Sequence, residues 1–142
     1  MPRTEVALFL LVLGAAAARA QDTAPVDSLA LARQYTQWLY YGEADSLLAH
    51  SSEWALERYA TREEWGRRSD MIAERLGFET NIIEEAWRLV NGRCEYWRTS
   101  QFSGLAVPFM IRWMLNEHWE IVGLQLSAPS AAPEAEAESC GG

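Results

Sequence analysis

The hydrophobic positions of this chain follow two different periods, and the change between them falls at Gly77. In the first part, Leu31, Tyr35 and Trp38 recur at the spacing of one face of an α-helix. Asp27 is a residue type that caps helix N-termini, and Gly42 is one that ends helices. The pattern therefore predicts a first helix between Asp27 and Gly42.

Two further helices are predicted before the change of period. A short one covers residues 44–50, and residues 51–60 are packed but without an assigned element. Thr61 and Glu64 form a capping box, in which each side chain can satisfy a free backbone N–H of the other. The helix that they start is predicted to end at Gly77. Its buried stripe is expected to consist of Trp65, Ser69, Ile72 and Leu76.

After Gly77 the apolar residues alternate with polar ones, which is typical of strands. Four strands are predicted, over residues 82–90, 93–102, 105–115 and 119–126. Asn91-Gly92 between the first two is a strong hairpin signal, and short links make neighbouring strands antiparallel. Pro108 has no N–H to give to a sheet, so an edge strand or a bulge is expected there.

Helices followed by an antiparallel meander predict the α+β class. We expect the N-terminal helices to pack on one face of a curved antiparallel sheet of about four strands.

The two ends of the chain differ from this domain in composition. Residues 1–20 combine Arg3, an uncharged apolar stretch and Ala18-Arg19-Ala20, which is the pattern of a cleaved secretory signal peptide. We interpret residues 21–26 as a linker, 27–129 as the domain and 130–142 as a disordered acidic tail. The mature protein is then exported, periplasmic or secreted, and has no further segment that could span a membrane.

Charge and cysteine content exclude several kinds of function. The 142 residues carry a net charge of -8, and all twelve basic residues are Arg, without a basic run. Nucleic acid and anionic lipid are therefore poor candidates for partners. Cys94 and Cys140 could pair in an oxidising compartment, but a strand thiol and a tail thiol are expected to stay unbridged. No metal or cofactor site is expected, because His50 and His118 lie far apart and no nucleotide-binding motif is present.

Several short segments together carry a resemblance to a known superfamily. They are Tyr40-Tyr41-Gly42-Glu43-Ala44-Asp45, Leu76-Gly77, Tyr96-x-Arg98 and the closing Trp119-Glu120-Ile121-Val122-Gly123-Leu124-Gln125-Leu126. With the order of elements over 27–129, the chain resembles the cone-shaped superfamily of nuclear transport factor 2. That superfamily includes ketosteroid isomerases and SnoaL-like cyclases. Within it the chain is most similar to small exported domains of unknown function, and the resemblance implies a conical pocket between the sheet and the first and third helices.

Three polar residues fall on strand faces that should be buried. Alternation places Glu85 on the inner face of the first strand, and Tyr96 and Arg98 on that of the second. A buried carboxylate needs a partner, and Arg98 could supply a bidentate one. We favour a structural ion pair, and the alternative is that Glu85, Tyr96 and Arg98 grip a ligand inside the cone.

Aromatic residues give a second set of candidates. Trp38, Tyr41, Trp54 and Trp65 could form the rim of the pocket, although aromatic residues at helical spacing more often belong to the core. Trp97 and Trp113 are expected on opposite faces of the sheet. An exposed Trp97 would indicate a homodimer through the sheet face.

These features favour a non-catalytic exported domain that binds a small apolar ligand or a protein partner through the pocket or the sheet face. The first alternative is an enzyme of the isomerase or cyclase type, for which Glu85 and Tyr96 are the only pair of acid–base groups to nominate. The second is a structural assembly domain with a filled cone. We assign no catalytic residue.

Overall fold

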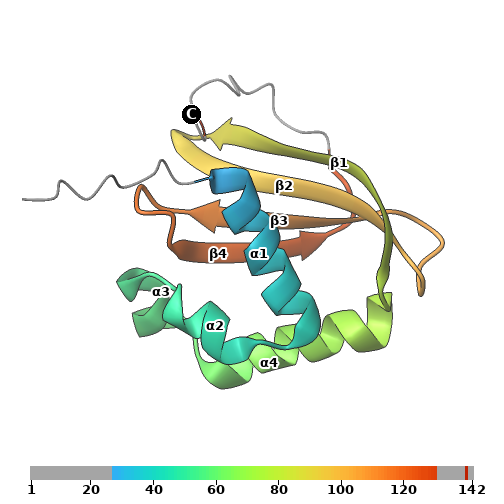
Figure 1. Ribbon diagram of the computed structural model, residues 1–142, viewed down its shortest axis with the longest axis horizontal. Coiled ribbons are helices and arrows are strands. Elements are labelled where there is room, and N and C mark those ends of the chain that lie inside the picture. Colours follow the sequence, from blue (N-terminus) through green and yellow to red (C-terminus); the bar gives the residue numbers. More distant parts are fainter. Residues whose placement is uncertain (1–26, 131–139, 141–142) are drawn as a thin grey trace, which may run out of the picture.

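The computed structural model describes residues 27–130 and 140 (Figure 1). The predicted signal peptide (1–20) and the linker (21–26) lie outside the described residues. So does the predicted acidic tail over 130–142, apart from Ser130 and Cys140.

The first half of the described chain is helical. Its elements are α1 (Ser28–Tyr41), α2 (Ala44–Ala49), α3 (Glu53–Arg58), α4 (Arg62–Met71) and a π-helical turn, η1 (Ile72–Leu76). The predicted ends of α1 are confirmed, because Asp27 Oδ1 accepts from Ala30 N at 3.0 Å and Gly42 adopts a left-handed φ of 71°. Ser52 caps α3, the helix that the sequence analysis left unassigned.

Half of the predicted capping box is present. The Thr61 hydroxyl accepts from the backbone N–H of Glu64 at 3.1 Å. The carboxylate of Glu64 binds Arg67 and Arg68 instead of reaching back to Thr61, since two guanidinium groups on the same helix offer stronger, charge-assisted bonds. The predicted buried stripe of this helix is confirmed from Trp65 to Leu76.

Four antiparallel strands follow in sequence order across one sheet: β1 (Glu79–Val90), β2 (Arg93–Phe102), β3 (Phe109–Leu115) and β4 (Ile121–Ser127). Asn91 and Gly92 both have positive φ, as a two-residue hairpin turn requires. Figure 1 shows all helices on one face of the curved sheet, with α1 lying across it. The predicted α+β class is therefore confirmed.

Two strands start three or more residues away from the prediction, and β4 is shifted by one or two residues at each end. β1 starts earlier, at Glu79, and two irregularities in its pairing lie between Glu79 and Asn81 and between Ile82 and Glu84. β3 starts only at Phe109, directly after Pro108, and lies between β2 and β4. The expectation of an edge strand or bulge at Pro108 was wrong. Pro108 lies one residue before β3, so the sheet does not need the backbone N–H that proline lacks.

The outer edge of β4 is occupied by groups from the helical half. The backbone carbonyl of Ile121 accepts from Ser52 N at 2.9 Å, and that of Leu124 accepts from Arg68 Nη1 at 3.0 Å. The Tyr59 hydroxyl donates to the carbonyl of Val122. β1 forms the opposite edge of the sheet.

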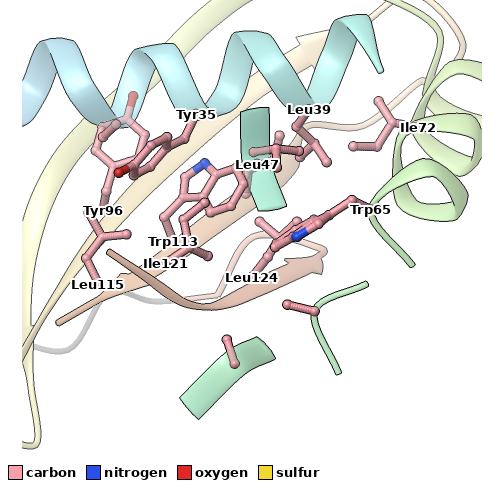
Figure 2. Packing of buried hydrophobic residues seen from close by; sticks show 14 of the residues in the cluster. Tyr35, Leu39, Leu47, Trp65, Ile72, Tyr96, Trp113, Leu115, Ile121 and Leu124 are labelled. Atoms are coloured by element: carbon pink, nitrogen blue, oxygen red, sulfur yellow. The ribbon is translucent and has the colours of Figure 1, made fainter. Parts of the chain in front are cut away.

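The hydrophobic core lies between the inner face of the sheet and the helices. Trp113 is at its centre, with ring centroids 5.9 Å from Tyr35 of α1 and 6.0 Å from Trp65 of α4 (Figure 2). Its indole N–H donates to the Thr36 hydroxyl at 3.0 Å, so the buried polar atom is satisfied.

A disulfide joins Cys94 in β2 to Cys140. The expectation of two unbridged thiols was therefore wrong. The Cα atoms lie 5.7 Å apart, which is within the usual range, and Cys140 is only 7% exposed. Cys140 belongs to the hydrophobic core cluster, and this packing brings the two thiols together.

Candidate functional site

A cavity of about 470 Å³ lies between the C-terminal half of α1, the turn η1 and the start of β1. This volume is within the range of small-molecule sites. Its lining consists of Thr36, Gln37, Tyr40, Tyr41, Ile72, Ala73, Gly77, Phe78, Glu79 and Arg98. The cavity is therefore lined mainly by apolar and aromatic side chains, and Glu79 and Arg98 are the two charged residues in the lining.

That pair is Arg98 and Glu79, and Tyr40 completes it. Arg98 binds both carboxylate oxygens of Glu79, with 2.9 Å between Nε and Oε2. The Tyr40 hydroxyl donates to the same Oε2 at 2.9 Å. Arg98 is only 8% exposed, so its charge is neutralised by a direct partner rather than by water.

A second ion pair lies next to the first. Arg33 of α1 binds Glu85 of β1, with 3.0 Å between Nε and Oε1, and the Tyr96 hydroxyl donates to Glu85 Oε2. Arg98 Nη1 lies 3.7 Å from Glu85 and 3.5 Å from the Tyr96 hydroxyl, which links the two pairs. The polar groups thus form one continuous network between α1 and the sheet.

The prediction that Glu85, Tyr96 and Arg98 share a face is confirmed, and Glu85 is paired with Arg98 in the strand register. The predicted bidentate bond between Glu85 and Arg98 was wrong. Each has a closer partner of opposite charge, Arg33 for Glu85 and Glu79 for Arg98. Neither partner was foreseen.

The network keeps both carboxyl groups ionised. Hydrogen bonds from Arg33 lower the pKa of Glu85, against the opposing effect of burial. Burial would raise the pKa of Glu79, but the hydrogen bonds from Arg98 and Tyr40 offset burial and leave this pKa below its ordinary value. Burial and the bond to Glu85 raise the pKa of Tyr96 to about 12, so its proton stays on the phenol.

The wall opposite the sheet is formed by the π-helical turn. Ile72 and Ala73 at its start and Gly77 at its end line the cavity. Gly77 has a φ of 78°, and a Cβ atom there would collide with the Ser103 hydroxyl. π turns are rare in helices and often occur at functional sites, because they add a residue and widen one turn.

Two aromatic residues at the rim are largely exposed. Tyr41 at the end of α1 is 79% exposed and Phe78, just before β1, is 71% exposed. Large apolar side chains left in water beside a cavity are typical of binding surfaces. Of the aromatic candidates from the sequence, Tyr41 is the one that lines this cavity.

Trp38, Trp54 and Trp65 do not line this cavity. Trp65 is fully buried in the core, where its indole N–H donates to the Ser51 hydroxyl at 3.2 Å. Trp38 is half-buried and stacks near His50, with ring centroids 4.7 Å apart. Trp54 is 48% exposed and lines a separate, smaller pocket of about 230 Å³ beside β4. The predicted aromatic rim is therefore not assembled around the cavity described here.

Trp97 and Trp113 lie on opposite faces of the sheet, as expected, since Tyr96 and not Trp97 is paired with Trp113. Trp97 is only 7% exposed, however. The Arg112 guanidinium lies 4.7 Å from the centroid of the Trp97 ring, and the indole N–H of Trp97 donates to Glu95 at 2.9 Å. The exposed tryptophan that would have indicated a dimer surface is absent from the described part of the sheet.

Some of the cavity and network residues that were not predicted do show a pattern in the sequence. Arg33, Gln37 and Tyr40 follow each other at helical spacing along α1, so a polar stripe could have been assigned to one face. Glu79 could not have been assigned to a face, because two irregularities in β1 separate it from Glu85 and break the alternation.

Within residues 27–130, no group of His, Cys, Asp and Glu side chains is arranged to hold a metal ion. The described helices include none that is both long and apolar enough to cross a membrane. Comparisons with models of known families, with curated proteins and with solved structures found no match to this chain. The resemblance to the superfamily of nuclear transport factor 2 therefore stays a prediction.

Proposed function

We propose that this protein is an exported, non-catalytic domain that resembles the superfamily of nuclear transport factor 2 and binds a small, mainly apolar ligand in the cavity between α1, η1 and β1. The observation that carries the proposal is the cavity of about 470 Å³, with aromatic walls and a single polar end formed by Arg98, Glu79 and Tyr40. An apolar enclosure with a few fixed polar groups is the usual design of a ligand site.

The state of Glu85 and Tyr96 supports binding over catalysis. A general base needs a free lone pair within reach of the substrate. The carboxylate of Glu85 already accepts hydrogen bonds from Arg33 and Tyr96, and neither Glu85 nor Tyr96 lines the cavity. Glu85 and Tyr96, the pair nominated for isomerase chemistry, are thus hydrogen-bonded to each other rather than placed toward a ligand in the cavity.

Two observations support export. The N-terminal sequence has the pattern of a cleaved signal peptide, and disulfides such as Cys94–Cys140 persist mainly in oxidising compartments.

Mass spectrometry of the protein expressed from residues 1–142 tests both parts of the proposal. Under denaturing conditions, a mass lower by that of residues 1–20 is expected for the secreted protein. Under native conditions, we expect a small-molecule adduct that disappears on denaturation. Retention of residues 1–20 would contradict export.

A variant with a blocked cavity shows whether the adduct occupies this site. Ala73→Trp places a large side chain in the cavity wall and is expected to abolish the adduct. Ala49→Trp is the matched control, because Ala49 is also exposed and helical but does not line the cavity. An adduct that persists in Ala73→Trp would contradict binding at this site.

A further inference from the structure

The charges that line the cavity balance each other. Glu79 and Arg98 are its two ionised residues, and they neutralise each other directly. The next pair in the network, Arg33 and Glu85, is balanced in the same way. The polar end of the cavity is therefore strongly polar without a net charge.

A hydrogen-bond donor of Arg98 nevertheless remains available at this end. Of the five N–H groups of a guanidinium, two in Arg98 donate to Glu79 and one approaches the Tyr96 hydroxyl at 3.5 Å. Nη1 also forms an ion pair with Glu85 at 3.7 Å, so the second N–H of Nη2 is the one group of Arg98 left without a partner among the described residues. Both oxygens of Glu79, by contrast, are engaged by Arg98 and Tyr40. The site can give hydrogen bonds more readily than it can accept them.

A charged ligand would disturb this balance. A carboxylate could bind Arg98 only beside the carboxylate of Glu79, and an ammonium could bind Glu79 only beside Arg98. In either case one charge would be left without a full partner beside two side chains that are themselves largely buried, which is costly. An uncharged oxygen acceptor can use the free N–H of Arg98 without that cost.

We propose that the cavity selects ligands whose polar end is uncharged and accepts hydrogen bonds, such as an amide or a ketone carbonyl on an apolar or aromatic body, and that the Glu79–Arg98 pair imposes this selection. The inference rests on the proposed function, since it names the ligand class of the same site.

Three probes with the same body and different charge test the selection: naphthalene-2-carboxamide, naphthalene-2-carboxylate and 2-naphthylmethylammonium. Isothermal titration calorimetry at neutral pH measures the affinity of each for the full protein. We expect the carboxamide to bind about tenfold more tightly, or better, than either ion, which corresponds to about 1.4 kcal/mol. All binding should be lost in Ala73→Trp and kept in Ala49→Trp.

Changing one charge of the pair should change the selection. Glu79→Gln removes the closest partner of Arg98 and leaves the network of Arg33, Glu85 and Arg98 with a net positive charge, so the carboxylate should become the preferred probe. Glu74→Gln is the matched control, because Glu74 is exposed on η1 and does not line the cavity. It removes the same charge and should leave the ranking unchanged.

The possible results separate the two proposals. Binding of the carboxylate or the ammonium as tightly as the carboxamide would overturn the selection and leave the binding site standing. A ranking that is the same in Glu79→Gln would overturn the role of the ion pair, provided that this variant has the far-ultraviolet circular dichroism of the parent. The binding site itself is contradicted if no probe binds to the parent protein, or if every probe that binds does so equally well to Ala73→Trp.

Discussion

At the scale of single residues, Arg98 has the most demanding environment in the site. It is 8% exposed and lies between the carboxylates of Glu79 and Glu85. Removing its side chain would leave Glu79 half-enclosed with only Tyr40 as a partner. A buried charge without its partner is much less favourable than the intact pair.

We therefore expect Arg98→Ala to lower the free energy of unfolding by about 3–5 kcal/mol. Urea unfolding followed by circular dichroism measures the change. Arg75→Ala is the control, since Arg75 is exposed on η1, and its effect should stay within about 0.5 kcal/mol. An equally small effect for Arg98→Ala would show that the pair is dispensable for stability and serves the ligand alone.

Gly77 is the second residue with a specific requirement. Its φ of 78° is unfavourable for other residues, and a Cβ would meet the Ser103 hydroxyl. We expect Gly77→Ala to lower the free energy of unfolding by about 1–3 kcal/mol.

Gly66→Ala provides the opposite case on the neighbouring helix. Gly66 lies inside α4, and a Cβ there would have no atom within 4 Å. This substitution should stabilise the protein by about 0.5–1 kcal/mol. Thermal unfolding of both variants gives the comparison, and equal shifts would contradict the assigned role of Gly77.

At the scale of elements, α1 is fastened to the strand β1 by two carboxylates. Glu85 binds Arg33, and Glu79 binds Tyr40 and also Arg98 of β2. Both carboxyl groups have a pKa below the ordinary value in the folded protein. The folded state therefore binds protons less readily than the unfolded chain at these two sites.

This difference predicts acid sensitivity. The stabilisation is fully present above the ordinary pKa of Glu, about 4.3, and is lost as the pH falls through the lower pKa values of the folded state. The free energy of unfolding should decline as the pH falls from about 5 towards 2. The double variant Glu79→Gln, Glu85→Gln should show a smaller decline over the same range, and an unchanged decline would contradict the assignment.

Local sequence signals predicted elements better than they predicted contacts between elements. The hairpin at Asn91-Gly92 and the cap at Asp27 depend on a few neighbouring residues, and both were predicted. The shared face of Glu85 and Arg98 followed from strand alternation. Their partners Arg33 and Glu79 did not, because one depends on the placement of α1 across the sheet and the other on irregularities in β1.

At the scale of the whole molecule, the disulfide closes a long section of chain. It joins residues 46 positions apart and connects the first hairpin of the sheet to a residue beyond its last strand. Constraining a loop of this length stabilises a folded protein by about 4 kcal/mol in the chain-entropy description.

We expect Cys140→Ser to lower the free energy of unfolding by up to about 4 kcal/mol. Adding a reducing agent to the parent protein should have a similar effect and should leave the variant unchanged. Guanidinium unfolding with and without the reductant measures both. A parent protein that is insensitive to reduction, with its cysteines shown to be reduced, would contradict a stabilising role.

The irregular pairing of β1 has a consequence for the behaviour of the protein at high concentration. Open sheet edges can recruit strands from other molecules, and this is a common route to aggregation. The edge at β4 is occupied by Ser52, Tyr59 and Arg68, whereas β1 exposes Ile82 and Ile83 near its irregularities. Irregularities of this kind interrupt the regular row of N–H and C=O groups that an incoming strand needs. The irregular start of β1, which also lines the cavity, is thus a poorer template for a further copy of the chain than the regular part of β1 over residues 84–90.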